Sequence, residues 1–600
     1  MNLRLQSVLT PGNAFCQEEK VYFHRSADGK VIDFDGYFNL FYIEKRKKYT
    51  DIHGVSLSLR LQGFSKLILM HDRDEIKELT VNTPEILSSV ECEFPYEDYD
   101  KGVFWFRLIT EKAFSGNASG GSETKEGENL VVVEGAYLGR IDVKRPSSIM
   151  VDICTYKRES YVTRNMKTIT EFLDKKENSD IAENIHIAIV DNGKTLSEFD
   201  ELQSIISAHP YITVYPNPNT GGSGGFTRGM KEALARKEEL SLTHVLLMDD
   251  DAYYDTDMFV RLFGMLNTLK EEYKDITVGG AIFREDYPYI QYACGEWYEQ
   301  FELYNEMINL DMRSYDECTQ KGMCTTEYDK QRYSGWWCCC YSLDVVSPDN
   351  LPLPMFVHYD DIEYGIRQRR NGNPITFLNG IGVWHRAFDG EFMGNKVYYN
   401  TRNMFIYSER HEPEAVKWYF ENKLRKDMTG CFFNHRYVDM HLIYMGVMDY
   451  FKGEDWFFNL NPEEHHKKIS NYVKAHSRYI TIDELAKYGC ENVKEEILRY
   501  QTHGNTIEKL LDRTKKEKRK VPWYEKLTIN GTLFSNKKGA VAITPVDGFW
   551  EKGYGYKKYI FVEKGNDRLL YVETDPKEFF EMLRMYLQIK RLAKVKLKNK

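Results

Sequence analysis

The sequence predicts an α/β protein in which a doubly wound domain follows a β-sandwich and precedes a mainly helical region. The chain has 600 residues, which is too long for one hydrophobic core and suggests roughly three or four domains. Short alternating apolar runs fill the first part, and strand-like runs alternate with helical ones in the middle. We therefore expect domains at residues 1–146, 147–410 and 411–600.

The first domain is expected to be a β-sandwich because its apolar runs are short and separated by polar turns. Residues 30–49, 54–71 and 102–111 have this pattern. The stretch from Ser115 to Asn129 is rich in Gly and Ser, and we expect it to be an exposed loop of the same domain.

Strands and helices alternate from about Ser148. We expect strands at residues 147–156, 184–193, 211–218 and 242–252, and helices at 161–176 and after the glycines that begin at residue 221. Polar groups follow three of these strands, namely Asp191, the glycine-rich loop and the run Asp249–Asp251. Ligands of doubly wound sheets bind at the carboxyl ends of the strands, so we expect the functional site there.

The last domain is expected to contain helices at residues 415–428 and 505–520, short strands at 540–554 and 558–564, and a closing helix at 579–600. The closing helix is basic and amphipathic. Two interpretations stay open for it, a terminal helix packed by its apolar face and a helix that docks on anionic lipid.

Composition excludes some classes of function. The net charge of −10 argues against nucleic acid as the main partner. No apolar stretch approaches the roughly 20 residues that span a bilayer, and no signal peptide is recognised, so we expect a cytoplasmic protein. The eleven cysteines include no paired C-x-x-C sets, which favours reduced and mostly buried thiols over a zinc site.

The acidic run after the fourth strand has the spacing of a metal site. In extended backbone Asp249 and Asp251 face the same side and Asp250 faces away. Two converging carboxylates need a cation between them, and Mn²⁺ or Mg²⁺ takes oxygen ligands that it commonly shares with a diphosphate. The alternative is an acidic turn or a helix N-cap.

The run from Asn217 to Gly229 opens a helix, and its glycines would let the backbone approach an anion. It lacks the Lys-Ser/Thr pair of a nucleotide-triphosphatase loop, so we reject that function. A purely structural glycine turn remains the alternative.

An Asp-x-Asp pair at the tip of the fourth strand resembles the metal-binding motif of nucleotide-sugar glycosyltransferases of the Rossmann-like GT-A type. This resemblance implies nucleotide-binding roles for side chains near the strand ends. Arg158 and Arg228 would meet the diphosphate, and Asp191 would recognise the uracil end. Asp250 is assigned either to the nucleotide or to a structural hydrogen bond.

Three later motifs carry further candidate residues. Trp336 and Trp337, in "YSGWWCCCYS", belong either to the core or to the wall of an acceptor-sugar pocket. Asp360 and Asp361 precede a helix, whose dipole favours an ionised carboxylate that could act as general base or as a plain N-cap. His385 ends an apolar run, as a structural residue or as a third metal ligand.

The order of five motifs resembles that in the bacterial polymerising galactofuranosyltransferases, which are inverting family 2 enzymes that use UDP-galactofuranose. The motifs are "GGSGGFTRG", "MDDDA", "GWWCCC", "FVHYDDIEYGIR" and "VWHRAF". The resemblance covers nearly the whole chain and implies an N-terminal β-sandwich, a central catalytic domain and a helical C-terminal region. Two roles stay open for the sandwich, which are glycan binding and assembly. The resemblance implies the following roles: metal ligands Asp249, Asp251 and His385; general base Asp361; acceptor-binding residues Asp360, Trp336 and Trp337.

The function expected on this basis is metal-dependent, inverting transfer of galactofuranose from UDP-galactofuranose to a growing cell-envelope or lipid-linked glycan. A rhamnosyl- or other hexosyltransferase, a noncatalytic glycan-binding scaffold and a nucleotidyltransferase are the alternatives. Peripheral contact with the inner membrane face is expected from the basic segments Lys515–Lys520 and Lys590–Lys600. The oligomeric state stays open, a homo-oligomer included.

Overall fold

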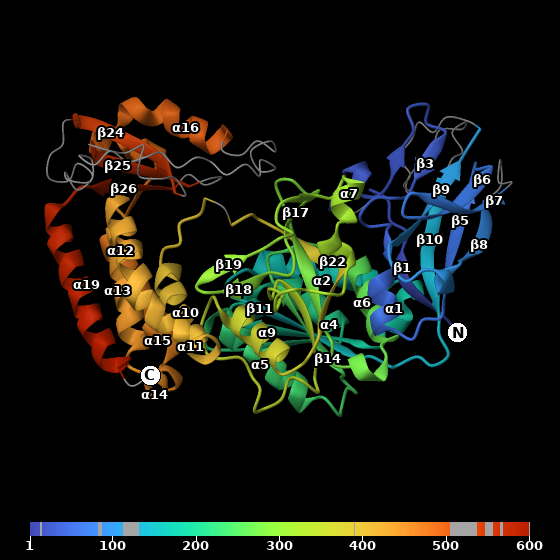
Figure 1. Ribbon diagram of the computed structural model, residues 1–600, viewed down its shortest axis with the longest axis horizontal. Coiled ribbons are helices and arrows are strands. Elements are labelled where there is room, and N and C mark those ends of the chain that lie inside the picture. The colour runs from blue at the N-terminus through green and yellow to red at the C-terminus, as the bar shows by residue number, and fades with distance from the viewer. Residues whose placement is uncertain are drawn as a thin grey trace. The chain divides into compact units, whose positions relative to one another are not determined.

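The computed structural model describes the chain except for residues 13–14, 82–86, 112–130, 389, 504–536, 547–555, 564–567 and 599–600. The chain forms two compact units (Figure 1). Unit 1 contains residues 1–299, 303–353 and 361–387, and unit 2 contains residues 300–302, 354–360 and 388–600. The first two expected domains thus pack together as one unit. The third domain was expected to begin at residue 411, whereas the main part of unit 2 begins at residue 388.

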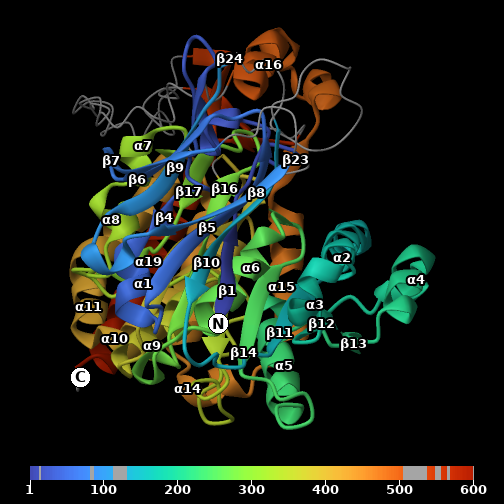
Figure 2. The ribbon, with the colours of Figure 1, turned by 90° about the vertical axis from the view of Figure 1, so that its right-hand side faces the viewer.

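Two antiparallel sheets form the N-terminal part of unit 1 (Figure 2). One has the order β1-β10-β5-β8, and the other has the order β2-β3-β9-β6-β7 with β4 beside β9. Their inner faces share one aromatic-rich core, as the predicted sandwich requires. The strands are β1 (Asn2–Ser7), β2 (His24–Arg25), β3 (Val31–Asp33), β4 (Phe41–Tyr42), β5 (Gly54–Gln62), β6 (Lys66–His71), β7 (Asp74–Thr80), β8 (Ser88–Phe94), β9 (Val103–Ile109) and β10 (Val131–Arg140).

One segment of this region differs from the prediction. Residues 43–49 were expected to continue a strand pattern but form helix α1 (Ile43–Tyr49). Ile43, Arg46 and Tyr49 are buried at a spacing of three, which is the helical period. The loop expected from Ser115 to Asn129 lies outside the described residues.

A mixed sheet forms the centre of unit 1. Its parallel half has the order β13-β12-β11-β14, and its other half continues through β21, β16, β17 and β20, with β22 parallel to β16. The strands are β11 (Ile149–Thr155), β12 (Ile185–Asp191), β13 (Ile212–Pro216), β14 (His244–Asp249), β15 (Tyr253–Tyr254), β16 (Thr277–Arg284), β17 (Ile290–Ala293), β20 (Leu310–Asp311), β21 (Cys338–Ser342) and β22 (Ile375–His385), beside the separate pair β18 (Trp297–Glu299) and β19 (Glu302–Tyr304).

The helices connecting these strands are α2 (Glu159–Leu173), α3 (Ser179–Ala182), α4 (Asp200–Ala208), α5 (Gly221–Ala235), α6 (Asp257–Leu266), α7 (Tyr315–Cys318), α8 (Lys321–Cys324) and α9 (Asp360–Arg370). The four predicted strands and the predicted helix at 161–176 are confirmed. Thr155 pairs with Asp191 and Cys154 with Asp249, so the carboxyl ends of β11, β12 and β14 meet at one edge. The sheet therefore brings Asp191 and Asp249 to the same edge.

The glycine-rich segment is helical, which corrects the expectation of a loop before the helix. Helix α5 begins at Gly221 and includes the following glycines. A Cβ on Gly225 would lie 2.0 Å from Cys154 Sγ, and one on Gly229 would lie 2.0 Å from Asp152 Oδ1. The glycines are therefore required because α5 packs directly onto β11, where no side chain fits.

The eleven cysteines are all free, and none of them is exposed. Cys338, Cys339 and Cys340 form most of the buried strand β21. Burial raises the pKa of the Cys339 thiol to about 12, because the thiolate would lose its hydration. The expectation of buried thiols is confirmed.

Unit 2 is mainly helical and also contains a sheet of order β23-β26-β25-β24. Its elements are α10 (Lys396–His411), α11 (Pro413–Trp418), a π-helical turn (Tyr419–Lys423), α12 (Leu424–Phe433), α13 (Tyr437–Tyr450), α14 (Glu454–Phe458), α15 (Pro462–His476), β23 (Arg478–Ile480), α16 (Lys494–His503), β24 (Lys537–Pro545), β25 (Tyr556–Val562), β26 (Leu569–Glu573) and α19 (Pro576–Lys596). The helix expected at 505–520 lies outside the described residues. Among the residues that the structure describes, no helix has both the length and the apolar character needed to cross a membrane.

Arg261 of α6 joins the N-terminal sheets to the central sheet. Its side chain is 1% exposed, and its guanidinium donates to Asp257 Oδ2 at 2.7 Å, to the Asn379 carbonyl at 3.1 Å and to the Phe38 carbonyl at 2.7 Å. Asn379 Nδ2 also donates to the Tyr37 and Leu40 carbonyls. These buried hydrogen bonds make the first two expected domains one packed unit.

We predict that Arg261→Leu lowers the free energy of unfolding by about 3–5 kcal/mol, because it leaves the Asp257 carboxylate buried without its partner. Urea denaturation measures the loss. Lys167→Gln is the control, since its pair with Glu201 is about half exposed on both sides and should contribute at most about 1 kcal/mol. Equal losses in both variants would contradict a special role for Arg261.

Candidate active site

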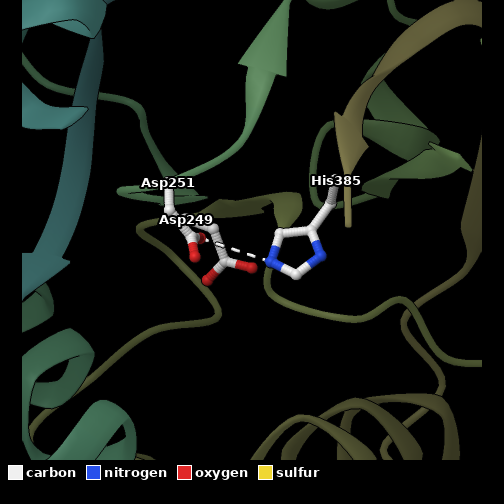
Figure 3. A group of neighbouring side chains, drawn as sticks. All are labelled: Asp249, Asp251 and His385. Carbon is white, nitrogen blue, oxygen red and sulfur yellow. Dashed lines mark ion pairs between the residues drawn. The ribbon is translucent and has the colours of Figure 1, made fainter. Parts of the chain in front are cut away.

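Three side chains converge at the carboxyl edge of the central sheet. Asp249 is the last residue of β14, Asp251 follows two residues later, and His385 is the last residue of β22. One ligand atom from each residue lies within 4.8 Å of the other two (Figure 3). His385 Nε2 lies 3.3 Å from Asp251 Oδ1. The structure thus brings together the three residues predicted as metal ligands.

The pKa shifts of these three residues show that the cluster stabilises a positive charge between its carboxylates. Burial and the charge of Asp251 raise the pKa of Asp249 to about 7. Burial alone would raise the pKa of Asp251, but its hydrogen bond and ion pair with His385 hold it below its usual value. Burial opposes protonation of His385, yet the two carboxylates raise its pKa to about 9. The carboxylates are therefore balanced in part by the imidazolium.

The chemistry of the three donors fits a divalent cation. Two carboxylate oxygens and one imidazole nitrogen suit Mn²⁺, and the two oxygens alone are also compatible with Mg²⁺. Asp249 and Asp251 repel each other when both are ionised, which is one cause of the raised pKa of Asp249. A cation between them would remove this repulsion. Among the described residues, this is the one cluster of at least three such side chains with metal-ligand geometry.

Helix α2 holds the acidic run in place. Arg158, at the N-cap of α2, pairs with Asp251 and donates to Asp250 Oδ1 at 3.1 Å. Asn165 Nδ2 donates to the Asp250 carbonyl at 2.8 Å, and Arg164 donates to the Ala252 carbonyl at 2.6 Å. Asp250 is 6% exposed and accepts the hydrogen bond from Arg158, and its predicted contact with the nucleotide stays a prediction. The Arg158 side chain remains 45% exposed and could still meet a ligand.

Asp361 lies at the start of α9, as predicted. Burial raises the pKa of its carboxyl to about 6, and its Oδ1 accepts a hydrogen bond from the Ile362 amide at 2.8 Å. A base with this pKa is mostly ionised at neutral pH and still takes up a proton readily. Asp360 is 9% exposed and belongs to unit 2, whereas the cluster described above belongs to unit 1.

Glu296 is a candidate site residue that the sequence did not reveal. It lies between β17 and β18, and the Tyr333 hydroxyl donates to its Oε2 at 3.2 Å. Burial and the negative charge of Asp361 raise the pKa of Glu296 to about 7. Two buried acids that influence each other are typical of catalytic sites. No motif distinguishes Glu296 from other acidic residues, because only the fold brings it near Asp361.

The segment that leads into α9 has an unusual backbone. Phe356, His358 and Tyr359 have φ angles of 73°, 64° and 68°, in the left-handed region that such residues rarely adopt. The Asn403 side chain, which is 0% exposed, donates to the carbonyls of Met355, Val357 and His358 at 3.0, 2.9 and 2.9 Å. Within unit 2, Asn403 therefore holds the strained segment that ends at Asp360.

The predicted tryptophans are separated by the structure. Trp336 is 4% exposed and packs in a core with Phe226 and Tyr364, and its Nε1 donates to Tyr341 at 3.3 Å. A ring so enclosed cannot form a pocket wall, which corrects its predicted acceptor role. Trp337 is partly exposed, and its carbonyl accepts a hydrogen bond from the Asp249 amide, so Trp337 lies beside the predicted metal ligands.

Asp191 and Arg228 make local contacts that sequence reasoning did not anticipate. The Asp191 carboxylate accepts from the amides of Gly193, Lys194 and Leu196 at 2.9, 2.8 and 3.0 Å, and so shapes the loop after β12. Arg228 Nε donates to Glu232 Oε1 at 2.6 Å, two turns into α5. Their nucleotide-binding roles stay predictions.

Part of this chain is similar to known glycosyltransferases. Residues 151–322 match the family Glycosyl transferase family 2. Galactofuranosyltransferase GlfT2 of Mycobacterium tuberculosis and that of Mycolicibacterium smegmatis are both 22% identical, over 401 and 405 residues, which is 63% of this chain. The match spans 58% of the length of each relative.

Among solved structures, mannosyltransferase PcManGT from Pyrobaculum calidifontis in complex with GDP-Man and Mn²⁺ matches 56% of this chain and 86% of its own. The sequence identity is 9% and the TM-score is 0.29, which is too low to add to the assignment. Residues 151–322 therefore form a glycosyl transferase family 2 domain, and 63% of this chain is similar to the two galactofuranosyltransferases.

Proposed function

We propose that this protein transfers galactofuranose from UDP-galactofuranose to a hydroxyl of a growing surface or cell-envelope glycan, with inversion at the anomeric carbon. The observation that carries the proposal is the convergence of Asp249, Asp251 and His385 at the carboxyl edge of a family 2 domain. The resemblance to galactofuranosyltransferases supports the choice of donor.

In this mechanism Asp249, Asp251 and His385 would hold a divalent cation, which would offset the negative charge of the leaving diphosphate. Arg158, already paired with the acidic run, supplies a second positive group at the same edge. Its half-exposed guanidinium can pair with a phosphate oxygen without leaving the helix that positions it.

Asp361 acts as the general base. Its carboxylate takes the proton of the acceptor hydroxyl as that oxygen forms a bond to the anomeric carbon. The bond between this carbon and the UDP oxygen breaks, and UDP leaves with the electron pair. A single displacement of this kind inverts the anomeric configuration. Glu296 stays mostly protonated where Asp361 ionises, because burial and the negative charge of Asp361 raise the pKa of Glu296 to about 7.

The acceptor side of the proposal rests on Trp337 and Asp360. The partly exposed Trp337 ring, fixed by its Nε1 hydrogen bond to the Gly280 carbonyl at 2.9 Å, offers a flat face on which a sugar can stack. Asp360 is proposed to bind an acceptor hydroxyl.

Helix α19 supports the proposed contact with the inner face of a membrane, where a lipid-linked acceptor would lie. Its buried face packs within unit 2 through Met582, Met585 and Ile589. Its opposite face exposes Phe580, Leu583 and Leu587, at 68%, 41% and 45%. Five Lys or Arg side chains follow residue 583 within the helix, so the exposed stripe combines apolar area with positive charge.

The metal proposal predicts that Asp249→Asn lowers the transfer rate roughly a hundredfold or more, since the cation contributes several kcal/mol. The same variant should weaken binding of Mn²⁺ alone, measured by titration calorimetry. Asp344→Asn is the control, because this carboxylate pairs with Lys237 and Lys274 away from the cluster. Unchanged Mn²⁺ affinity in Asp249→Asn would exclude the assigned ligands.

The base proposal predicts that Asp361→Asn reduces UDP release from UDP-galactofuranose by about 10²–10⁴-fold while folding is preserved. In the parent enzyme the rate should fall as the pH drops through about 6, where Asp361 takes up a proton. Glu296→Gln should leave this fall at nearly the same pH, because Glu296, with a pKa of about 7, is already mostly neutral near pH 6. Activity confined to a dTDP-sugar in a donor screen would contradict the galactofuranosyl assignment.

The membrane proposal predicts that the protein floats with vesicles containing anionic lipid and not with neutral ones. Phe580→Ser with Leu587→Ser should abolish flotation, because both side chains belong to the exposed stripe. Exposed Phe458 of α14 provides the matched control as Phe458→Ser. Equal flotation of all variants would rule out α19 as the contact.

A further inference from the structure

A wide polar cleft lies in unit 1, away from the residues assigned to catalysis. Its volume is about 1190 Å³, and it is lined by residues of α1, of the turn between β6 and β7, of the segment before β9, and of α7, α8 and the residues that follow α8. None of its lining residues belongs to the candidate active site. The cleft therefore lies between the N-terminal sheets and residues 315–327.

The walls of this cleft are held by buried and partly buried hydrogen bonds. The Glu44 carboxylate accepts from the Thr326 amide at 2.8 Å and from its hydroxyl at 2.9 Å. Tyr42 donates to the Cys318 carbonyl at 2.8 Å, and Trp105 Nε1 donates to the Asp72 carbonyl at 2.6 Å. Each bond links two wall segments or fixes a turn, so the cleft is preformed and a ligand need not order it.

The lining chemistry selects a class of ligand. Five Lys or Arg residues and six Asp or Glu residues line the cleft, together with several hydroxyl groups. The near balance of charge disfavours a polyanion such as nucleic acid. Small-molecule pockets are mostly apolar and of about 300–1,000 Å³, so a single small apolar ligand is also a poor match. A neutral chain that carries many hydroxyl groups satisfies both donors and acceptors.

Several lining groups point into solvent and are available to such a chain. The Arg73 and Asp316 side chains, which pair at 2.5 Å, are 71% and 80% exposed, and Asp100 is 88% exposed. The Arg73 guanidinium lies over the Tyr315 ring, 5.2 Å from its centre, and so covers this face of the ring. The exposed carboxylates and cations of the cleft can bind pairs of hydroxyl groups on a sugar.

We propose that this cleft is a second glycan-binding site, which holds a neutral oligosaccharide at a place separate from the transfer site. The binding itself does not depend on the proposed function. Its role does rest on that function: sugar residues added earlier to the acceptor would occupy the cleft and keep the chain bound between transfers.

The test uses the full chain and calorimetric titration with a neutral galactofuranose oligosaccharide. Arg73→Gln with Asp100→Asn should weaken binding about tenfold, because two groups that bind hydroxyls are removed. The matched control is Arg60→Gln with Asp142→Asn, two exposed positions of the same N-terminal region outside the cleft. Transfer to a single-sugar acceptor should be unchanged in both, whereas KM for a long acceptor should rise in the cleft variant alone.

Equal affinity of the parent, cleft and control proteins would overturn the proposal, as would the absence of any oligosaccharide binding. Lys321→Gln, another lining position, serves as the second variant if the first unfolds. Binding that depends on the cleft in a protein that transfers no sugar from any donor would uphold the site and refute the proposed function. Sugar transfer without binding that depends on the cleft would uphold the proposed function and refute the second site. The two failures are therefore distinguishable.

Discussion

The organisation of the candidate site depends on one electrostatic constraint, the placement of three consecutive carboxylates at the end of a buried strand. β14 is buried along its length until Asp249, so the acidic run begins where the sheet meets solvent. The run is stable only because positive groups from elsewhere face it. Arg158 reaches it from α2 and His385 reaches it from the end of β22. Low surrounding polarity strengthens each of these interactions.

The same edge requires close backbone packing. α5 covers β11 so tightly that Gly225 and Gly229 leave no room for a Cβ. The carboxyl of Asp152, on β11 beneath Gly229, is fully buried, and burial raises its pKa well above the usual value. A neutral acid in this position avoids a second uncompensated charge behind the acidic run. The glycines thus determine how near α5 and its N-terminal amides come to the strand ends.

The backbone segment that precedes Asp361 is strained and is held by hydrogen bonds. Left-handed backbone at Phe356, His358 and Tyr359 is costly, and such residues persist only where the surroundings hold them. Asn403 supplies three hydrogen bonds for this purpose. The segment that ends at Asp360 is therefore held by a residue that is distant in sequence.

The sequence by itself determined the order of strands and helices, because hydrophobic periodicity is local, and it determined that Asp249 and Asp251 share one side of the strand. It also identified Asp361 and His385 through their motifs. Only the tertiary structure decided that His385 faces Asp251, that Glu296 lies near Asp361 and that Trp336 belongs to the core. The helical state of the glycine segment was likewise decided by its contact with β11. Distances between segments far apart in the chain depend on how the sheet closes, and no local pattern encodes them.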